Sequence, residues 1–258
     1  MNCKICSTKS ENIFSAKILH KYEINYYHCP NCGFLQTEEP YWLKESYDSA
    51  IGIEDTGLLK RNFTLAKTAS VIINSLFNKR STFLDYAGGY GIFVRLMRDI
   101  GFDFYWSDPF AKNLVARGFD FNNEDKIELI TAFECFEHFN TPITEIEKML
   151  HISNNILFST RVFNGRPPQP DSWWYYSLNS GQHISFYSIS TLKFIADKYK
   201  LYLNTDNKSL HLLSEKKINN TYFNLLKKMS SLGLAGILNL SLKSKTDLDN
   251  ELLNSKKI

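Results

Sequence analysis

Four of the five cysteines stand in two Cys-x-x-Cys pairs near the start of the chain, separated by residues 7–28. Thiolates at this spacing on tight turns can share one tetrahedral Zn²⁺, with metal–sulfur bonds of about 2.3 Å. Because four thiolates leave no open coordination position, the spacing predicts a structural zinc site rather than a catalytic one. The alternative is two unrelated redox or buried thiol pairs. The predicted ligands are Cys3, Cys6, Cys29 and Cys32.

A second group of residues suited to chemistry lies in the segment 83–108, FLDYAGGYGIFVRLMRDIGFDFYWSD. An apolar run meets Asp85, and a small-residue turn, a helical pattern and a second apolar run ending at Asp108 follow. Glycines let the backbone turn tightly and approach a ligand, and an acidic residue closing the second strand can accept hydrogen bonds from ribose hydroxyls. The alternative for Asp108 is a helix cap. The pattern predicts a βαβ unit that holds a nucleoside cofactor, with contacts from Asp85, Ala87, Gly88, Gly89, Gly91 and Asp108.

Two histidines are candidates for proton transfer. His183 is the first, because the ordinary pKa of imidazole suits proton transfer near neutrality; the alternative is a structural bond to the backbone. His138 follows a predicted strand at the end where α/β sites form, which suits substrate positioning as well as catalysis. Glu134, in the same segment, either contacts the cofactor or caps the sheet end.

The loop 167–183, PPQPDSWWYYSLNSGQH, brings four aromatic residues together. Flat aromatic faces suit sugars, nucleobases or a sulfonium, through stacking and cation–π contact. The alternative is an aromatic plug that packs the loop onto the sheet. Flanking arginines could bind a phosphate through two hydrogen bonds or simply be solvated. The predicted acceptor-binding residues are Trp173, Trp174, Tyr175, Tyr176, Arg161 and Arg166.

The sequence predicts that strands and helices alternate from residue 82 onward, and these elements position the candidate residues. A parallel sheet is therefore expected, with a closing antiparallel edge hairpin. Expected strands cover 82–86, 103–107, 127–133, 154–160, 201–206 and 209–214. Expected helices cover 91–100, 110–117, 142–150 and 189–199, and 40–77 is mostly helical. The predicted parts are a zinc-binding unit (1–40), a helical connector (41–80), the cofactor-binding domain (81–215) and a helical tail (216–258).

Composition and charge argue against nucleic-acid binding and against a membrane span. The net charge of +3 and the lack of a basic stripe argue against nucleic acid as a partner. No secretory leader is recognised, and the apolar stretch 232–242 is too short to span a bilayer, so a cytoplasmic location is expected. The tail is expected to form a helical hairpin docked on the domain or on a partner. A weak membrane contact by an interfacial helix is the alternative.

Residues 82–215 resemble a class I S-adenosylmethionine-dependent methyltransferase. The resemblance rests on D-x-A-G-G-x-G, on the acidic end of the second strand, and on the motif A-F-E-C-F-E-H over 132–138. It implies a Rossmann-like doubly wound sheet and S-adenosylmethionine as cofactor. The zinc pairs resemble the sugar C-methyltransferase subgroup, in which a Glu-His motif after a late strand supplies the catalytic base. The similar stretch here is GQHISFYS over 181–188.

The chain departs from that pattern at three places. Ala87 stands where the family usually has a glycine, and its methyl group is expected to require a negative φ. Gln182 replaces the glutamate of the Glu-His motif. The chain also ends soon after the core, without the subgroup's large second domain, so the subgroup's own substrate is not carried over.

The resemblance predicts methyl transfer to a small acceptor, a nucleotide-linked sugar or related precursor in polysaccharide biosynthesis. Two alternatives stay open. One is a methyltransferase fold that binds without catalysis, which the departures at Ala87 and Gln182 favour. The other is a methyltransferase for RNA or protein, in which the zinc unit would serve recognition.

Overall fold

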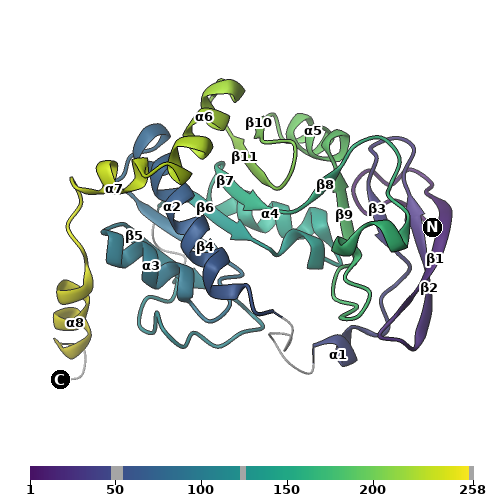
Figure 1. Cartoon of the computed structure of the whole chain (residues 1–258), viewed down its shortest axis with the longest axis horizontal. Coiled ribbons are helices and arrows are strands. Elements are labelled where there is room, and N and C mark those ends of the chain that lie inside the picture. Colours follow the sequence, from purple (N-terminus) through teal and green to yellow (C-terminus); the bar gives the residue numbers. More distant parts are fainter. Residues whose placement is uncertain (48–54, 123–125, 256–258) are drawn as a thin grey trace. The chain divides into compact units, whose positions relative to one another are not determined.

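The computed structural model describes residues 1–47, 55–122 and 126–255 (Figure 1). The chain forms two compact units. Unit 1 comprises Met1–Gly52, Phe133–His151 and Phe158–Lys217, and unit 2 comprises Ile53–Ala132, Ile152–Leu157 and Ile218–Ile258. Part of the predicted helical connector, residues 48–54, lies outside the described residues, as do 123–125 of the predicted cofactor domain and 256–258 of the tail. The four predicted parts remain a prediction.

Unit 1 contains a five-stranded sheet in the order β1-β2-β3-β9-β8. Strands β1 (Glu11–Ile18), β2 (Tyr22–His28), β3 (Leu35–Thr37) and β9 (Ser185–Ser188) pair antiparallel, while β8 (Val162–Phe163) runs parallel to β9. Strands β1 and β2, which lie between the two cysteine pairs, thus form a hairpin. Because β3 pairs with β9, the cysteine-bearing segment shares one sheet with the segment that follows His183 (Figure 1).

Unit 1 also contains helices and strands outside that sheet. They include α1 (Leu43–Ser46), most of α4 (Pro142–Ile152), α5 (Ile189–Lys198) and the 3-10 helices η1 (Phe136–His138), η2 (Pro170–Ser172) and η3 (Trp174–Tyr176). Strands β10 (Tyr202–Thr205) and β11 (Leu210–Ser214) form the expected antiparallel edge hairpin. A cluster of buried aromatic rings, including Tyr26, Tyr176 and Phe186, forms the core beside β2 and β9.

Unit 2 contains the predicted parallel strands. Strand β4 (Thr82–Tyr86) pairs in parallel with both β5 (Asp103–Ser107) and β6 (Ile127–Phe133). Together with β7 (Ile156–Ser159) these strands belong to a six-stranded sheet in the order β10-β11-β7-β6-β4-β5. Helix α2 (Leu58–Leu76) precedes β4, and α3 (Ile92–Ile100) connects β4 to β5. These elements confirm a mixed α/β fold with a parallel sheet of Rossmann-like type.

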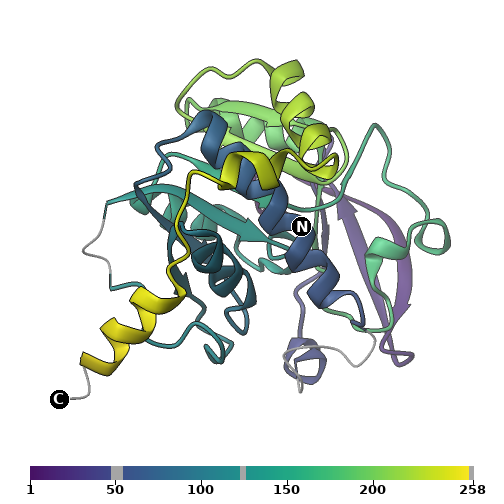
Figure 2. The same ribbon diagram turned by 60° about the vertical axis from the view of Figure 1, so that its left-hand side comes forward.

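The tail forms α6 (Asn220–Ser231), α7 (Leu234–Asn239) and α8 (Thr246–Ser255) in the described residues. Helices α6 and α7 pack against α2 (Figures 1 and 2), where Val71, Leu226 and Ala235 form a buried cluster. Because α2 lies in the predicted connector (41–80), this packing places α6 and α7 against the connector, and docking of this hairpin on the predicted cofactor domain stays a prediction. No helix among the described residues is long and apolar enough to cross a membrane. Weak membrane contact of the tail stays a prediction, and Leu232, Ile237 and Leu240 are exposed.

One expected helix is absent. Residues 110–117 do not form a helix, because their amide groups bond to partners outside a helical repeat. The amides of Leu114 and Val115 both donate to the carbonyl of Tyr90, and that of Ala116 donates to the side chain of Asn113. The apolar residues of this segment recur at helical intervals. Their backbone amides nevertheless bond to a side chain and to a distant carbonyl, and these acceptors replace the carbonyls that a helix would offer.

Candidate cofactor, metal and acceptor sites

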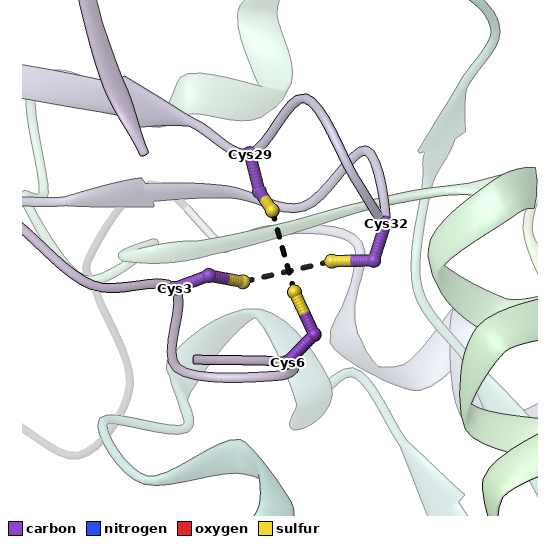
Figure 3. A group of neighbouring side chains, drawn as sticks. All are labelled: Cys3, Cys6, Cys29 and Cys32. Carbon is purple, nitrogen blue, oxygen red and sulfur yellow. Dashed lines mark hydrogen bonds between the residues drawn. The ribbon is translucent and has the colours of Figure 1, made fainter. Parts of the chain in front are cut away.

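The four predicted cysteines converge in unit 1. Their sulfur atoms point toward a common centre (Figure 3), with Sγ–Sγ distances of 3.5 Å for Cys3–Cys32 and 3.4 Å for Cys6–Cys29. All four ligand atoms lie within 4.8 Å of one another. Tetrahedral bonds of about 2.3 Å would place sulfur atoms slightly less than 4 Å apart, so the donor set fits one Zn²⁺.

The two cysteine turns have the same backbone pattern. In the first, the amide of Ser7 donates to Cys3 O at 2.9 Å; in the second, Gly33 donates to Cys29 O at 2.9 Å. Ser7 and Gly33 both have left-handed φ, of 62° and 76°. Two turns of one geometry thus present their thiols to the same point (Figure 3).

Neighbouring residues lock the second turn in place. A Cβ added at Gly33 would lie 2.4 Å from Ser190 Oγ and 2.5 Å from Ser188 Oγ. Ser188 caps α5 in a capping box with Thr191, and Thr191 Oγ1 donates to Cys32 O at 3.0 Å. The hydrogen bond from Cys32 is the main cause that lowers the pKa of Cys3 to about 5.

The predicted cofactor turn joins β4 to α3 in unit 2. The expectation for Ala87 is wrong, because its φ is +56° rather than negative. Gly89 and Gly91 are also left-handed, and a Cβ at Gly89 would meet no atom of the described residues within 4 Å. A Cβ at Gly88 would come within 2.8 Å of both Asp85 Oδ2 and Trp106 Cδ1. The turn is thus crowded on the side of Gly88 and open at Gly89, which fits the close approach of a ligand.

Replacing Ala87 with glycine is expected to stabilise the protein. A left-handed residue with a side chain costs about 1–2 kcal/mol, part of which the greater freedom of glycine in the unfolded chain offsets. We expect Ala87→Gly to raise the free energy of unfolding by about 0.5–1 kcal/mol in urea titrations. Ala69→Gly, in buried α2, should act in the opposite direction. Equal or lower stability of Ala87→Gly would refute strain at this turn.

Asp108 is held by backbone amides. Its Oδ2 accepts from Gly89 N at 2.9 Å, while Oδ1 accepts from Phe110 N at 2.8 Å and Ala111 N at 2.9 Å. The latter two bonds match the predicted cap, although no helix follows. A carboxylate has about four lone-pair positions, so these contacts leave about one for a ligand hydroxyl.

Asp85 is buried beneath the same turn. Thr131 Oγ1 donates to Asp85 Oδ1 at 2.7 Å. Burial raises the pKa of Asp85 to about 7, the bond from Thr131 opposes that rise, and the charge of Asp108 adds to it. A positively charged group of a ligand would favour the ionised carboxylate.

This raised pKa predicts a pH-dependent stability. Between about pH 4, where Asp85 titrates in the unfolded chain, and about pH 7, the folded state binds more protons than the unfolded state. The free energy of unfolding therefore falls as pH rises through this window. Asp85→Asn should remove that loss, so its stability relative to the native protein should be greater at pH 8 than at pH 5 in urea titrations. Asp171→Asn, at an exposed position, serves as the control. The same relative stability at both pH values would refute the shift.

The two predicted histidines lie together in unit 1. Their ring centroids are 4.9 Å apart, and the rings are nearly perpendicular. His138 Nδ1 lies 3.1 Å from Gln182 O and 3.1 Å from Tyr47 Oη, while His183 Nδ1 lies 2.7 Å from Tyr175 O. Burial lowers the pKa of His183 to about 3, with a further contribution from His138 that the bond to Tyr175 opposes. His183 is therefore neutral near pH 7, and a weak base.

Glu134 directly follows β6. Its φ is +52°, its amide donates to Ser159 Oγ at 2.8 Å, and Ser159 Oγ donates to its Oε1 at 2.5 Å. This local bonding matches the predicted cap of the strand end. Its role toward the cofactor stays a prediction.

The aromatic loop divides into buried and exposed residues. Tyr175 and Tyr176 are buried in the core of unit 1, as the alternative of an aromatic plug requires. Trp174 is 72% exposed, and the guanidinium of Arg161 lies 5.4 Å from its ring centroid. Arg166 is also exposed. Trp174 and Arg161 together present an aromatic and cationic surface.

Sequence reasoning assigned no role to Glu137, although the E-H pair over 137–138 carried a signal for it. Glu137 is buried next to His138, and its Oε2 has no hydrogen-bond partner among the described residues. Tyr47, which lies far from His138 in the sequence, also reaches this site, with its Oη 3.1 Å from His138 Nδ1.

A family model described as a methyltransferase domain matches residues 61–204, more than half of the 258-residue chain. A search of curated proteins gave no match.

Several solved structures align with part of the chain. The mitomycin 7-O-methyltransferase aligns with a TM-score of 0.45 and 10% identity, over 68% of this chain and 60% of that one. The magnesium protoporphyrin IX methyltransferase from Synechocystis PCC 6803 with bound SAH aligns with a TM-score of 0.44 and 9% identity, over 67% and 92%. Human N-acetylserotonin methyltransferase in complex with SAM aligns with a TM-score of 0.43 and 11% identity, over 68% and 66%. The chain spans less than two thirds of the first of these.

Proposed function

Because the chain belongs to the methyltransferase domain family, we propose that it transfers a methyl group from S-adenosylmethionine to a small acceptor. Membership confirms the predicted class of enzyme. The acceptor we propose is a nucleotide-linked sugar or a related glycan precursor. The observation that carries the cofactor assignment is the β4–α3 turn, which is open at Gly89 and flanked by two acidic side chains.

Unit 2 would bind the donor. Gly88, Gly89 and Gly91 would approach the amino-acid end of the cofactor, and the turn at Ala87 would bring Asp85 toward its ammonium group. Asp108, with one lone-pair position left, would accept from a ribose hydroxyl. When bound, the cofactor supplies an electrophilic methyl group, and the residues around it orient that group.

Unit 1 would bind the acceptor. The exposed face of Trp174 suits stacking on a sugar or base, and Arg161 and Arg166 suit a phosphate. Trp173, Tyr175 and Tyr176 would support this surface, since the ring centroids of Trp173 and Tyr176 are 5.0 Å apart. His138 and His183 would contact the reacting group of the acceptor. The low pKa of His183 favours a neutral imidazole that accepts a hydrogen bond.

A structural Zn²⁺ held by Cys3, Cys6, Cys29 and Cys32 completes the proposal. It would hold the two cysteine turns together and so fix β2 and β3. The amide of Thr37, at the end of β3, donates to Ile184 O at 3.1 Å, next to His183. The zinc would thus support the histidine pair through the sheet.

Transfer of a labelled methyl group tests this function. The protein is incubated with methyl-labelled S-adenosylmethionine and with nucleotide sugars, free sugars, RNA or protein in separate reactions. We expect label on a nucleotide sugar, and a raised KM with little change in kcat for Trp174→Ala. Label only on RNA or protein would overturn the acceptor class. Binding of the cofactor without transfer to any acceptor would favour the catalytically silent alternative.

A further inference from the structure

Three side chains converge outside the cysteine cluster, at the junction of η1 and the segment before β9. Glu137, His138 and His183 each offer one ligand atom, and these atoms lie within 4.8 Å of one another. The two segments are joined by the backbone, because the amide of Ile184 donates to Glu137 O at 2.9 Å. All three residues belong to unit 1.

Both imidazoles are oriented by backbone carbonyls. His138 Nδ1 bonds to Gln182 O, and His183 Nδ1 bonds to Tyr175 O. A carbonyl oxygen only accepts, so we assign the proton of each ring to Nδ1 and the lone pair to Nε2. Histidines that bind metals are commonly held in this way, with one nitrogen donating to a carbonyl and the other facing the ion.

Glu137 supplies an independent observation. The residue is only 1% exposed, and its Oε2 has no hydrogen-bond partner in the part of the chain that the structure describes. A buried carboxylate oxygen that has lost its hydration without gaining a donor or a cation is strongly unfavourable. A bound cation would satisfy this oxygen.

We propose that Glu137, His138 and His183 form a second metal site, for a divalent first-row transition ion such as Zn²⁺ or Fe²⁺. Two imidazoles and one carboxylate are a donor set that such ions accept, with bonds of about 2.0–2.2 Å. Tetrahedral bonds of this length place the donor atoms about 3.3–3.6 Å apart, so the side chains must close around the ion. Unlike the cysteine cluster, three protein ligands leave positions open for a small molecule.

These open positions suggest a use. An oxygen or nitrogen atom of the acceptor could bind there and be polarised by the ion, a role that rests on the proposed methyl transfer. The metal site itself does not depend on that function.

Binding of Co²⁺ tests the site directly. Full-length protein with zinc already in the cysteine cluster is titrated with Co²⁺, without cofactor or acceptor, by calorimetry and visible absorption. We expect one further equivalent of metal, whose spectrum lacks a thiolate-to-cobalt charge-transfer band. Binding should weaken about 10-fold or more in Glu137→Gln and His183→Ala. His151→Ala, at an exposed histidine, should bind as the native protein does.

Two results would overturn the proposal. One is the absence of a further equivalent in the native protein, which would leave the histidines in the role proposed above. The other is unchanged binding in both variants. Glu137→Gln keeps the shape of the side chain, and retained zinc in the cysteine cluster reports that each variant is folded. Failure of methyl transfer would not affect this titration.

Discussion

Cys32→Ser is expected to lose the zinc of the cysteine cluster and to destabilise unit 1 more than any other single change considered. The cluster joins two turns that are far apart in the chain, and each thiol is one of only four ligands. Structural zinc sites in small peptides contribute about 10–16 kcal/mol of apparent binding energy, which is also folding energy. We expect the loss of one equivalent of zinc in atomic emission and a large fall in thermal stability.

Cys135→Ser is the matched control. Cys135 is a buried thiol that does not belong to the cluster, so its variant should keep the zinc of the native protein. Equal zinc content in Cys32→Ser and Cys135→Ser would refute the cluster as a metal site. A fall in stability of Cys32→Ser without loss of zinc would show that Cys32 matters only for packing.

Asp249→Ala is expected to cost about 3–5 kcal/mol of stability and to release α8. Both oxygens of Asp249 bond to Arg98, at 2.6 Å and 2.8 Å, and both side chains are almost completely buried. Burial works to raise the pKa of Asp249, but the hydrogen bonds and charges of Arg98 and Arg95 outweigh it and lower the pKa. Removing the carboxylate leaves the buried guanidinium of Arg98 with the partly exposed Asp103 as its remaining ionic partner in the described residues.

Two measurements separate this effect from a general loss of fold. Hydrogen exchange should increase in α8 and at 243–245, where the chain passes so close to Gly101 that a Cβ there would lie 2.6 Å from Lys243 O. Asp247→Ala, on an exposed position of the same helix, should change stability little. A loss below 1 kcal/mol for Asp249→Ala, with native exchange in α8, would contradict the role of this ion pair.

Local patterns predicted most of the regular elements. The apolar runs that became β4, β5 and β6, the helical repeat of α3 and the spacing of the cysteines each depend on neighbours in sequence. The expected helix over 110–117 failed because its amides bond to Tyr90 and Asn113 instead. The expectation of a negative φ at Ala87 failed because the conformation of the turn overrides the preference of a single residue.

The candidate sites were less predictable where they depend on contacts across the chain. Spacing identified Cys3 and Cys29 as members of pairs, but the contact of His138 with His183 joins segments that only the sheet brings together. Composition does not tell which of several adjacent aromatic residues is buried. Packing in the folded chain buries Tyr175 and leaves Trp174 exposed. Glu137 Oε2 lacks a hydrogen-bond partner within residues 1–47, 55–122 and 126–255, and this is evident only in the folded chain.

Titration calorimetry with S-adenosylmethionine tests the central claim most directly. The account predicts binding of one equivalent, and weaker binding by Asp108→Ala, which removes an acceptor for the ribose and the bond that holds Gly89. Asp171→Ala, at an exposed position of unit 1, should bind as the native protein does. Absence of heat from the folded native protein, or the same affinity in Asp108→Ala, would contradict cofactor binding at the β4–α3 turn.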